Sequence, residues 1–519
     1  MPHTTMLDVL DAAASANVEY IFSDVTGERT TVKFEDLWRD ANAMADTLEH
    51  RSGQTAALML TPDPKTIAAL LGAWIAGVHT VSLPTPARGQ AIEAYVATIE
   101  SLCNAADVSF ILGRPDFPIP SLGEIVDVGT LADNPPKTRC VQTAISNLIQ
   151  CSSGSTSHPK GVVLSTTHLL HNIDAILARA TPVVGGAATV GWLPLSHDMG
   201  LIGLFLCPLV AAVIRPSANK TQVVLDDPGR FVRNPHSWVE LIGEFKAVNT
   251  VGPPFGMDRL AAFVERRGTD ADLSSLAQFT VGSEMVRVEM LERFIAAFQP
   301  QGLNPMCLCP SYGMAEVGLA VSMDRHDTMY SVADVSIEAL NANGVLAPAS
   351  VVTAGPPLLS SVVTVDAADT HGIGELVVAS PSVGNYLHAD IGQGHHTSDI
   401  GFIASTGHVV PLGRLDDVIV VAGRNVLGWD IDAAAIHPAI KYGHAVGVSD
   451  GNNGLALVAE RLATTPMTDA PAIELELKRQ VRNALGVSPS RLVLIEPNTF
   501  PRTPSGKVQR RKLAELANR

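Results

Sequence analysis

Residues 150–164 read QCSSGSTSHPKGVVL, a stretch crowded with hydroxyl side chains and glycines and containing one lysine, Lys160. Residues 144–149 before it are short and apolar and predict a strand, and residues 167–180 after it carry leucines and isoleucines at helical spacing. A turn of this composition between a strand and a helix offers backbone N–H groups, hydroxyls and one cation, which suits a polyphosphate. It is not a Walker P-loop, which requires Gly-Lys-Ser/Thr, and the alternative is a Ser/Gly-rich surface turn.

Length and composition limit the class of protein. The chain has 519 residues, which predicts roughly three to four domain-sized units. Its 46% hydrophobic and 17% charged residues are typical of a soluble globular protein. A formal net charge of −16 argues against a nucleic-acid partner and against attraction to an anionic membrane, although it allows a local basic pocket.

The sequence shows no targeting or membrane-spanning segment. The N-terminal residues lack the basic start and apolar run of a signal peptide. The longest apolar run, 201–214, is too short to span a membrane and contains Pro208, so it predicts a buried core segment. The six cysteines show no metal-ligand spacing. We therefore expect a reduced, cytoplasmic protein.

Strand and helix patterns alternate over most of the chain, which predicts crossover connections and mostly parallel sheets flanked by helices. The clearest predicted elements are helices over 65–75, 238–245 and 287–298 and strands over 79–83 and 247–251. From about residue 354 to residue 413, short apolar runs at 362–365 and 376–380 predict a small β-rich subdomain.

The strongest internal boundary lies at residues 413–417, just before a clean strand over 418–421. It divides an N-terminal domain over 1–413 from a small α+β C-terminal domain over 414–519. The polar and basic tail, TFPRTPSGKVQRRKL over 499–513, predicts a solvated C-terminus.

Four further stretches contain residues that could carry chemistry, each with a plain structural alternative. GWLPLSHDMG, at 191–200, places His197 and Asp198 after a strand-like run, although a single histidine is more often structural than catalytic. PSYGMAE, at 310–316, offers Tyr312 to stack on a base and Glu316 to hold a hard cation such as Mg²⁺. A helix start with Glu in its first turn would explain that second stretch equally well.

The other two stretches lie closer to the C-terminus. His396-Thr397-Ser398-Asp399, with Arg414 downstream, places a carboxylate that could accept ribose hydroxyls, or simply an Asx-type turn. Residues 502–507, RTPSGK, place Lys507 on a Gly/Ser/Pro loop, where its charge could meet a developing phosphate or carboxylate charge.

Together and in this order, these motifs resemble the adenylate-forming superfamily of acyl-CoA synthetases, peptide-synthetase adenylation domains, luciferases and fatty acyl-AMP ligases. The resemblance runs from about residue 10 to the C-terminus. The sequence WLPLSHDMGL at 192–201, the Ala in Tyr312-Gly313-Met314-Ala315-Glu316, extra chain between 323 and 355, and Gly423-Arg424-Asn425 resemble the fatty acyl-AMP ligases most.

The resemblance implies a two-step enzyme that uses ATP and Mg²⁺. A carboxylic acid attacks the α-phosphate of ATP to give an acyl-adenylate and pyrophosphate, and a thiol of an acyl carrier protein or of CoA then takes the acyl group. Both reactants of the first step are anionic, so positioning and charge neutralisation would dominate catalysis.

The resemblance also implies residue roles. Lys507, His197 and Glu316 would be catalytic, with Glu316 binding Mg²⁺ and His197 near the acyl channel. Asp416 would be the hinge for rotation of the C-terminal domain. The nucleotide would be held by Ser152, Ser153, Gly154, Ser155, Thr156, Lys160, Gly282, Ser283, Glu284, Ser311, Tyr312, Gly313, Met314, Ala315, Asp399 and Arg414. The acyl pocket would include His197, Gly252, Pro253, Pro254 and Gly282.

Two positions depart from the superfamily pattern. Ser157 and Ser398 stand where relatives usually have glycine, which raises the question of a different backbone there. An acyl-CoA or aryl-CoA synthetase of the same fold is one alternative, and a non-catalytic acyl- or nucleotide-binding relative is another. The acid itself, fatty, aryl or polycyclic, stays open at this point.

Overall fold

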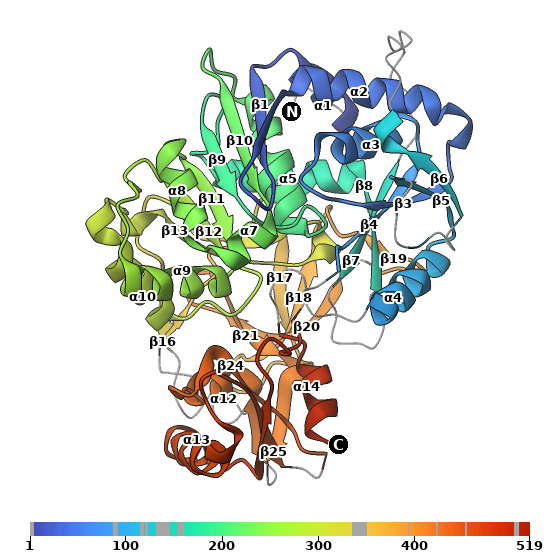
Figure 1. Cartoon of the computed structure of the whole chain (residues 1–519). Coiled ribbons are helices and arrows are strands. Elements are labelled where there is room, and N and C mark those ends of the chain that lie inside the picture. The colour runs from blue at the N-terminus through green and yellow to red at the C-terminus, as the bar shows by residue number, and fades with distance from the viewer. Residues whose placement is uncertain are drawn as a thin grey trace.

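The computed structural model describes residues 5–86, 92–114, 119, 123–130, 146–152, 160–334, 350–392, 394–421, 424–451, 454–502 and 508–518. Two large mixed sheets with flanking helices form most of the chain, a small antiparallel sheet adjoins them, and a separate α+β unit lies below (Figure 1). The predicted α/β fold class is confirmed.

The first sheet has eight strands, and its central strands β13 to β1 pair in parallel. Strands β14 and β2 add antiparallel edges. In their order in the sheet, the strands are β14 (Ala320–Met323), β13 (Leu308–Gly313), β12 (Gln278–Val281), β11 (Asn249–Gly252), β9 (Ala188–Gly191), β10 (Thr221–Asp226), β1 (Val18–Ser23) and β2 (Arg29–Lys33).

The second sheet has seven strands, of which β7 to β6 are parallel and β8 and β19 antiparallel. In sheet order they are β19 (Asn385–Tyr386), β8 (Lys160–Ser165), β7 (Asn147–Ser152), β4 (His79–Leu83), β3 (Thr55–Met59), β5 (Val108–Gly113) and β6 (Glu124–Asp127).

Helices cover both sheets, and α5 contacts β14 of the first sheet and β8 of the second. Ser165 caps α5, and its buried leucines and isoleucines explain why this segment is helical. The helices of this part are α1 (Met6–Ala14), α2 (Phe34–Thr47), α3 (Pro64–Ile75), α4 (Ile92–Ala105), α5 (Thr166–Arg179), α6 (Cys207–Ile214), α7 (Pro228–Arg233), α8 (His236–Glu244), α9 (Pro254–Arg267) and α10 (Val288–Phe298).

The small antiparallel sheet occupies the region where a β-rich subdomain is predicted. Its order is β17 (Val362–Asp366), β18 (Gly374–Ala379), β20 (His395–Ile403) and β21 (Val409–Arg414). The chain between 323 and 355 contributes a hairpin of β15 (Val332–Asp334) and β16 (Ser350–Val352). Residues 339–341, which are part of the predicted family-specific insertion, lie outside the described residues.

The last unit has its own sheets and its own buried core. It comprises β22 (Val418–Val421) and β23 (Arg424–Leu427), α12 (Gly428–Ala434), β24 (Ile440–Ser449), β25 (Leu455–Arg461), α13 (Ala470–Leu485), β26 (Arg491–Ile495) and α14 (Arg510–Ala517). Figure 1 shows this unit below the two large sheets.

Most predicted elements lie within a few residues of those observed, and the differences have physical causes. The tail is not simply solvated, because α14 buries Leu513 and Ala517 and packs on β24 and β25. The apolar run 201–214 is core, as predicted, and divides into a π-helix, η4 (Met199–Leu206), followed by α6.

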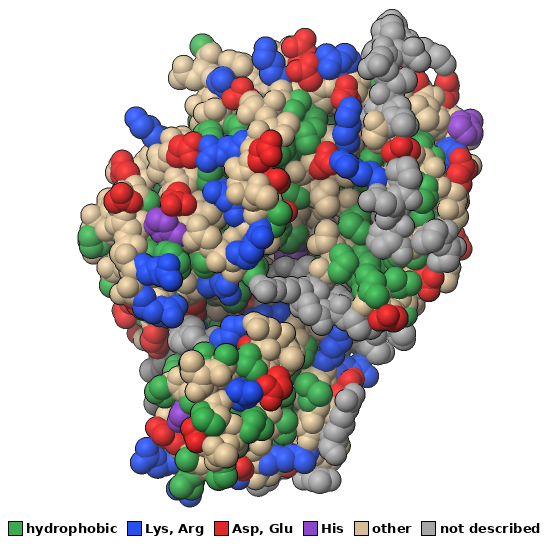
Figure 2. All heavy atoms as spheres, viewed as in Figure 1, with side chains coloured by type: hydrophobic (Ala, Val, Ile, Leu, Met, Phe, Trp, Pro, Cys, Tyr) green, Lys and Arg blue, Asp and Glu red, His purple; other side chains and the backbone are tan. Residues whose placement is uncertain are grey.

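The surface mixes charges of both signs on the face seen in Figure 2. Within the described part of the chain, no helix combines the length and apolarity needed to cross a bilayer.

Candidate active site

One large cavity of about 1350 Å³ lies where the first sheet, the β-rich subdomain and the C-terminal unit meet. It begins near the carboxyl ends of the parallel strands, the edge at which open α/β sheets bind ligands. The predicted site residues that line it are His197, Ser283, Glu284, Ser311, Tyr312, Gly313, Met314, Ala315, Glu316, Asp399, Arg414 and Asp416. The fold therefore brings together residues separated by more than two hundred positions.

The Ser/Gly-rich loop joins two antiparallel strands, so the predicted turn over 150–164 contains a strand, β8, that the sequence reading missed. β7 pairs with β8 so that Ser152 lies opposite Lys160, and α5 begins only at Thr166. Residues 161–164 are apolar and extend as a strand because they pair with β7. Strand β8 therefore separates the loop from the first turn of α5.

The loop residues Ser153, Gly154, Ser155, Thr156 and Ser157 lie outside the described residues, as do the side chains of Ser152 and Lys160. The strand leading into the loop is tied to the second motif, because the amide nitrogen of buried Gln150 donates to the carbonyl of Ser196. Strand β7 and the residue before His197 are therefore joined directly.

His197 lies at the start of η4 and faces the cavity. Its Nδ1 is 2.6 Å from Oδ1 of Asp198, and the same carboxylate accepts the backbone N–H of Met199 at 2.7 Å. Asp198 thereby fixes both the imidazole and the first turn of the π-helix. The side chain of His197 is therefore held in one orientation in the cavity wall.

Asp399, Arg414 and Tyr312 form one polar cluster. Asp399 and Arg414 are register partners on β20 and β21, with Arg414 Nε 3.5 Å from Asp399 Oδ1. The Tyr312 hydroxyl donates to Asp399 Oδ2 at 2.7 Å. Burial and the neighbouring Asp399 raise the pKa of Tyr312 well above its usual value, so the phenol stays a donor. The carboxylate is held where it can accept further hydroxyls.

Ser398, which stands where relatives usually have glycine, keeps the backbone conformation that glycine favours. Its φ is 59°, so the backbone keeps the left-handed conformation that favours glycine, although a side chain is present. The Ser398 N–H donates to Glu375 at 2.8 Å, and the other oxygen of Glu375 lies 2.9 Å from His396 Nδ1. These bonds hold the turn that presents Asp399.

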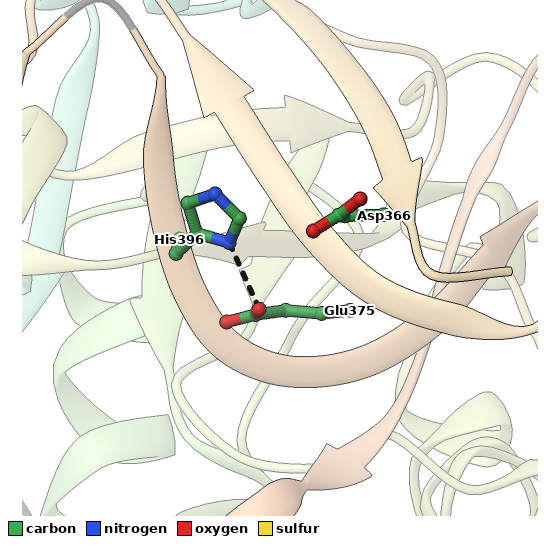
Figure 3. A group of neighbouring side chains, drawn as sticks. All are labelled: Asp366, Glu375 and His396. Carbon is green, nitrogen blue, oxygen red and sulfur yellow. Dashed lines mark hydrogen bonds and ion pairs between the residues drawn. The ribbon is translucent and has the colours of Figure 1, made fainter.

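Figure 3 shows Glu375 and His396 together with Asp366. Ligand atoms of the three lie within 4.8 Å of one another, a spacing that one cation could bridge. The contact to Glu375 raises the pKa of His396. We assign no ion to this group, because its internal hydrogen bonds and the Ser398 turn account for the arrangement.

Glu316 faces the cavity and is supported from β19. The Tyr386 hydroxyl donates to Glu316 Oε1 at 3.1 Å, and the Gly384 N–H donates to the Glu316 carbonyl at 2.9 Å. Burial and the charge of Glu316 raise the pKa of Tyr386. A cavity-facing carboxylate oxygen of this kind is the donor that Mg²⁺ prefers.

The Gly282-Ser283-Glu284 segment is placed by tight packing. A Cβ on Gly282 would lie 2.6 Å from Ser311 Oγ, so only glycine lets the two strands' ends approach this closely. Gly282 itself does not line the cavity, whereas Ser283 and Glu284 do. Glu284 accepts the Phe255 N–H at the start of α9 at 3.2 Å.

One wall of the cavity differs from the prediction. Gly252, Pro253 and Pro254, predicted for the acyl pocket, are not among the described residues that line the cavity. Gly252 faces the Trp238 indole, where a Cβ would meet carbon at 2.4 Å. The same strands line it instead with Asn249, Val251, Gln278 and Thr280. Two amides within buried strands were the sequence signal for this, since apolar residues are expected there.

The C-terminal unit borders the cavity. Asp416 lines it, and the adjacent Asp417 lies 3.7 Å from Arg510 on α14, which also pairs with Asp432 at 2.7 Å. Burial raises the pKa of Asp417. Lys507 lies outside the described residues, but the next described residue, Val508, lines the cavity.

Comparison with known proteins agrees with this geometry. The family model described as AMP-binding enzyme matches residues 10–386. The chain belongs to the AMP-binding enzyme family. This family comprises adenylate-forming ligases, so the protein is an adenylate-forming ligase, and the resemblance stated from its motifs is confirmed.

Proteins similar to this AMP-binding enzyme include bacterial ligases. A putative ligase of Mycobacterium tuberculosis is 28% identical, over 84% of this chain and 85% of its own length. The medium-chain-fatty-acid–[acyl-carrier-protein] ligase JamA of Moorena producens is 28% identical, over 98% and 94%. A structure from a study of fatty acyl-adenylate ligases of E. coli and L. pneumophila superimposes with a TM-score of 0.89 at 23% identity, over 99% and 98%.

Proposed function

We propose that this AMP-binding enzyme activates a hydrophobic carboxylic acid as an acyl-adenylate, releasing pyrophosphate, and passes the acyl group to a carrier-protein thiol. The observation that carries the proposal is the single cavity that joins the Asp399–Arg414–Tyr312 cluster, Glu316 and an acyl-sized interior beside the sheet. The similarity to JamA, named as a ligase of a fatty acid and an acyl carrier protein, supports the choice of thiol.

The nucleotide end of the site would work by positioning and by charge neutralisation. Asp399, oriented by Tyr312 and Arg414, accepts the ribose hydroxyls. Ser283, Glu284, Ser311, Gly313, Met314 and Ala315 enclose the base. Ser152 to Thr156 and Lys160 hold the leaving phosphates. Together they align the α-phosphorus with the attacking carboxylate.

Glu316 is the residue that would hold Mg²⁺, since its carboxylate faces the cavity and Tyr386 orients it. A divalent cation there would neutralise charge on the phosphate oxygens during phosphoryl-group chemistry. His197, held by Asp198, lines the cavity and would lie near the acyl channel. It would position the carboxylate between that interior and the nucleotide.

Asp416 would act as the hinge that lets the C-terminal unit serve both half-reactions. It lies between β21 and β22 and borders the cavity, so a rotation there would exchange what faces the nucleotide. In the orientation for adenylation, Lys507 would bridge the acyl carboxylate and the α-phosphate.

The test is pyrophosphate release with ATP and a panel of fatty and aryl acids. Lys507→Ala is expected to lower adenylation a hundredfold or more, equivalent to about 3 kcal/mol, because one cation stabilising the transition-state charge is lost. Lys220→Ala is the control, since Lys220 pairs with Glu19 at the surface. Near-normal adenylation by Lys507→Ala would overturn the proposed role of this lysine.

A CoA ligase of the same fold is the second candidate, because the putative fatty-acid–CoA ligases of Mycobacterium tuberculosis are also similar. Supplying CoA or a holo-carrier protein in separate reactions distinguishes the two. Acyl-adenylate that accumulates with CoA and is consumed by the carrier protein supports our proposal, whereas rapid acyl-CoA formation supports the alternative. Absence of acyl-adenylate with every acid would indicate a non-catalytic relative.

A further inference from the structure

Two buried amide side chains lie side by side in the wall of the cavity. Asn249 is the register partner of Gln278 on the neighbouring parallel strand, and Thr189 flanks Asn249 on its other side. Asn249 and Gln278 are each only 2% exposed, and both line the cavity. We call Asn249 and Gln278 the amide pair.

Each amide nitrogen of the pair has an internal partner, whereas each amide oxygen has none. Asn249 Nδ2 donates to Thr189 Oγ1 at 3.4 Å, and Gln278 Nε2 donates to Thr280 Oγ1 at 3.1 Å. Asn249 Oδ1 and Gln278 Oε1 are buried without a hydrogen-bond partner among the described residues. Such atoms cost free energy in a protein interior, so two together in one cavity wall indicate a missing donor.

The amide pair lies deep in the cavity. Gln278 is the first residue of β12, whereas Ser283 follows the end of that strand at the nucleotide end. At about 3.3 Å per residue, this distance is roughly 16 Å. Met323 of β14 contacts Gln278, and the apolar side chains Leu177 of α5 and Ala180, which caps it, also line the cavity. The far part of an acyl chain would reach this depth.

The chemistry of the pair selects one kind of group. An alkyl chain would leave both oxygens unpaired, and an ammonium would lack a carboxylate among these neighbours. A hydroxyl can donate to either oxygen, and it can also accept if an amide is turned so that its nitrogen faces inward. A hydroxyl has one proton and can pair with only one of the two oxygens as they stand. When one amide is turned so that its nitrogen faces inward, a single hydroxyl donates to the oxygen of one amide and accepts from the nitrogen of the other.

We propose that the acid activated by this enzyme carries a hydroxyl group near the far end of its acyl chain, bound between Asn249 and Gln278. This inference rests on the proposed adenylation and narrows its substrate class. A site built around a hydroxyl rejects the analogue that lacks it, because the amide oxygens then stay buried and unpaired.

The test compares unbranched fatty acids of increasing length with matched acids that bear a hydroxyl on the last or penultimate carbon. Pyrophosphate release by the full-length enzyme gives kcat/KM for each pair. We expect the hydroxy acid of the best length to be preferred tenfold or more. Replacing the pair by leucines, in Asn249→Leu/Gln278→Leu, should abolish this preference or reverse it.

Gln301→Leu is the matched control, because Gln301 also has a buried, unpartnered amide oxygen but does not line the cavity. It should keep the preference of the natural enzyme. Calorimetry with non-hydrolysable acyl-adenylate analogues, with and without the hydroxyl, measures binding without turnover. If the double variant does not fold, the single variants Asn249→Leu and Gln278→Leu replace it.

The outcomes separate the two proposals. Equal or better use of the plain acids by the natural enzyme, with the leucine variants unchanged, would overturn the hydroxyl inference while leaving adenylation intact; a buried water would then occupy the pair. If neither series of acids yields acyl-adenylate or binds as the adenylate analogue, both the hydroxyl inference and the choice of a fatty acyl substrate fail.

Discussion

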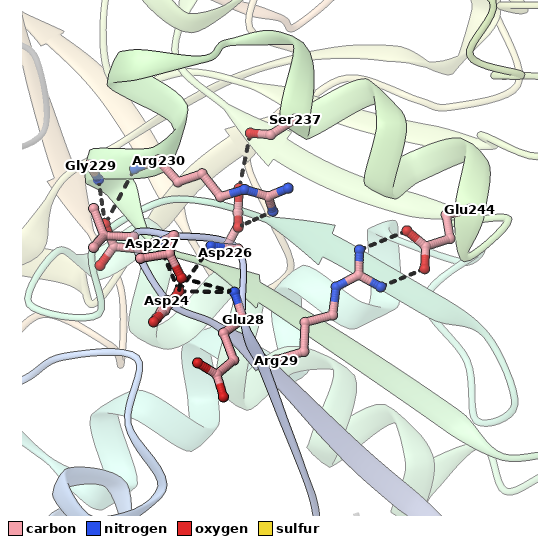
Figure 4. A network of polar contacts seen from close by, with 12 residues as sticks. Asp24, Glu28, Arg29, Asp226, Asp227, Gly229, Arg230, Ser237 and Glu244 are labelled. Carbon is pink, nitrogen blue, oxygen red and sulfur yellow. Dashed lines mark hydrogen bonds and ion pairs between the residues drawn. The ribbon is translucent and has the colours of Figure 1, made fainter.

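The amide pair contrasts with a second buried polar cluster, the Asp226 network at the end of β10. Asp226 is 2% exposed, Arg230 donates to its Oδ1 at 2.8 Å, and Ser237 donates to its Oδ2 at 3.1 Å. Figure 4 shows both partners directed at the carboxylate. Burial raises the pKa of Asp226, and the guanidinium of Arg230 opposes that rise. The network lies outside the cavity.

The difference between the clusters teaches how to distinguish structural from functional buried polarity. Both carboxylate oxygens of Asp226 accept hydrogen bonds from other residues of the protein, whereas neither amide oxygen of the amide pair accepts a hydrogen bond from a described residue. Completed hydrogen bonds stabilise the fold. The unpaired oxygens of the amide pair expose almost no surface as they stand, and they become available to a ligand when an amide turns toward the cavity. Substitutions in the first cluster should therefore change stability, and substitutions in the second should change specificity.

The largest effect is expected from Asp226→Ala. It removes one partner of a buried ion pair and leaves Arg230 without its carboxylate, which should lower the free energy of unfolding by about 4 kcal/mol. Denaturant titration measures this, and acid preference in the surviving folded enzyme should be unchanged. Asp36→Ala serves as control, because Asp36 pairs with Arg39 at the surface and should cost less than about 1 kcal/mol. A loss of unfolding free energy in Asp226→Ala as small as that in Asp36→Ala would show that the Asp226 network does not stabilise the fold more than a surface ion pair does.

A second paired cluster, in the C-terminal unit, should respond to pH. Burial lowers the pKa of His444 to about 4, against the opposing effect of the hydrogen bond that His444 Nδ1 donates to the Glu460 carboxylate at 2.8 Å. The unfolded chain then binds a proton between pH 6.5 and about 4 that the folded chain does not, so stability should fall by about 3 kcal/mol as pH drops through this window.

Unfolding free energies measured from pH 7 to pH 4.5 test this dependence on His444. His444→Gln should flatten the profile in that window, since an amide does not titrate. If the unfolding free energies of the natural protein and of His444→Gln fall in parallel as the pH drops, a group other than His444 causes the pH dependence. The amide pair cannot titrate, so preference for the hydroxy acid should not follow the same curve.

Asn249→Leu is expected to act in the opposite direction on stability. Leucine has similar size and removes a buried unpaired oxygen at the loss of one long hydrogen bond, so the free energy of unfolding should rise by about 1 kcal/mol. Thermal unfolding in the absence of ligand is the measurement. Destabilisation of the ligand-free enzyme would mean that Asn249 serves the fold, as Asp226 does.

The smallest effect concerns the mouth of the cavity. Ser398→Gly should stabilise the protein by about 0.5 kcal/mol, because relief of the left-handed serine exceeds the greater freedom of glycine in the unfolded chain. The hydrogen bond from residue 398 N–H to Glu375 stays available. Chemical denaturation of both proteins at one pH provides the comparison. A loss of stability would show that the serine hydroxyl matters more than backbone strain.

The sequence by itself determined the fold class, most elements and the nucleotide-facing motifs. Spacing of apolar residues reports the helical or extended period directly, which is why α5, α10, β4 and β22 are close to their predicted positions. The Tyr312-to-Glu316 motif and the pair Asp399 and Arg414 could be recognised from the sequence because each lies within a short segment of the chain. The structure places them in one cavity.

Only the tertiary structure decided which residues lie together across strands. Asn249 and Gln278 meet because β11 and β12 are neighbours in a specific register, and neither sheet order nor register is a property of a local pattern. The same reason explains why Gly252 faces Trp238 and not the acyl chain, and why α14 packs through Arg510 against Asp432. The long-range contacts that position the site are those that a linear pattern cannot report.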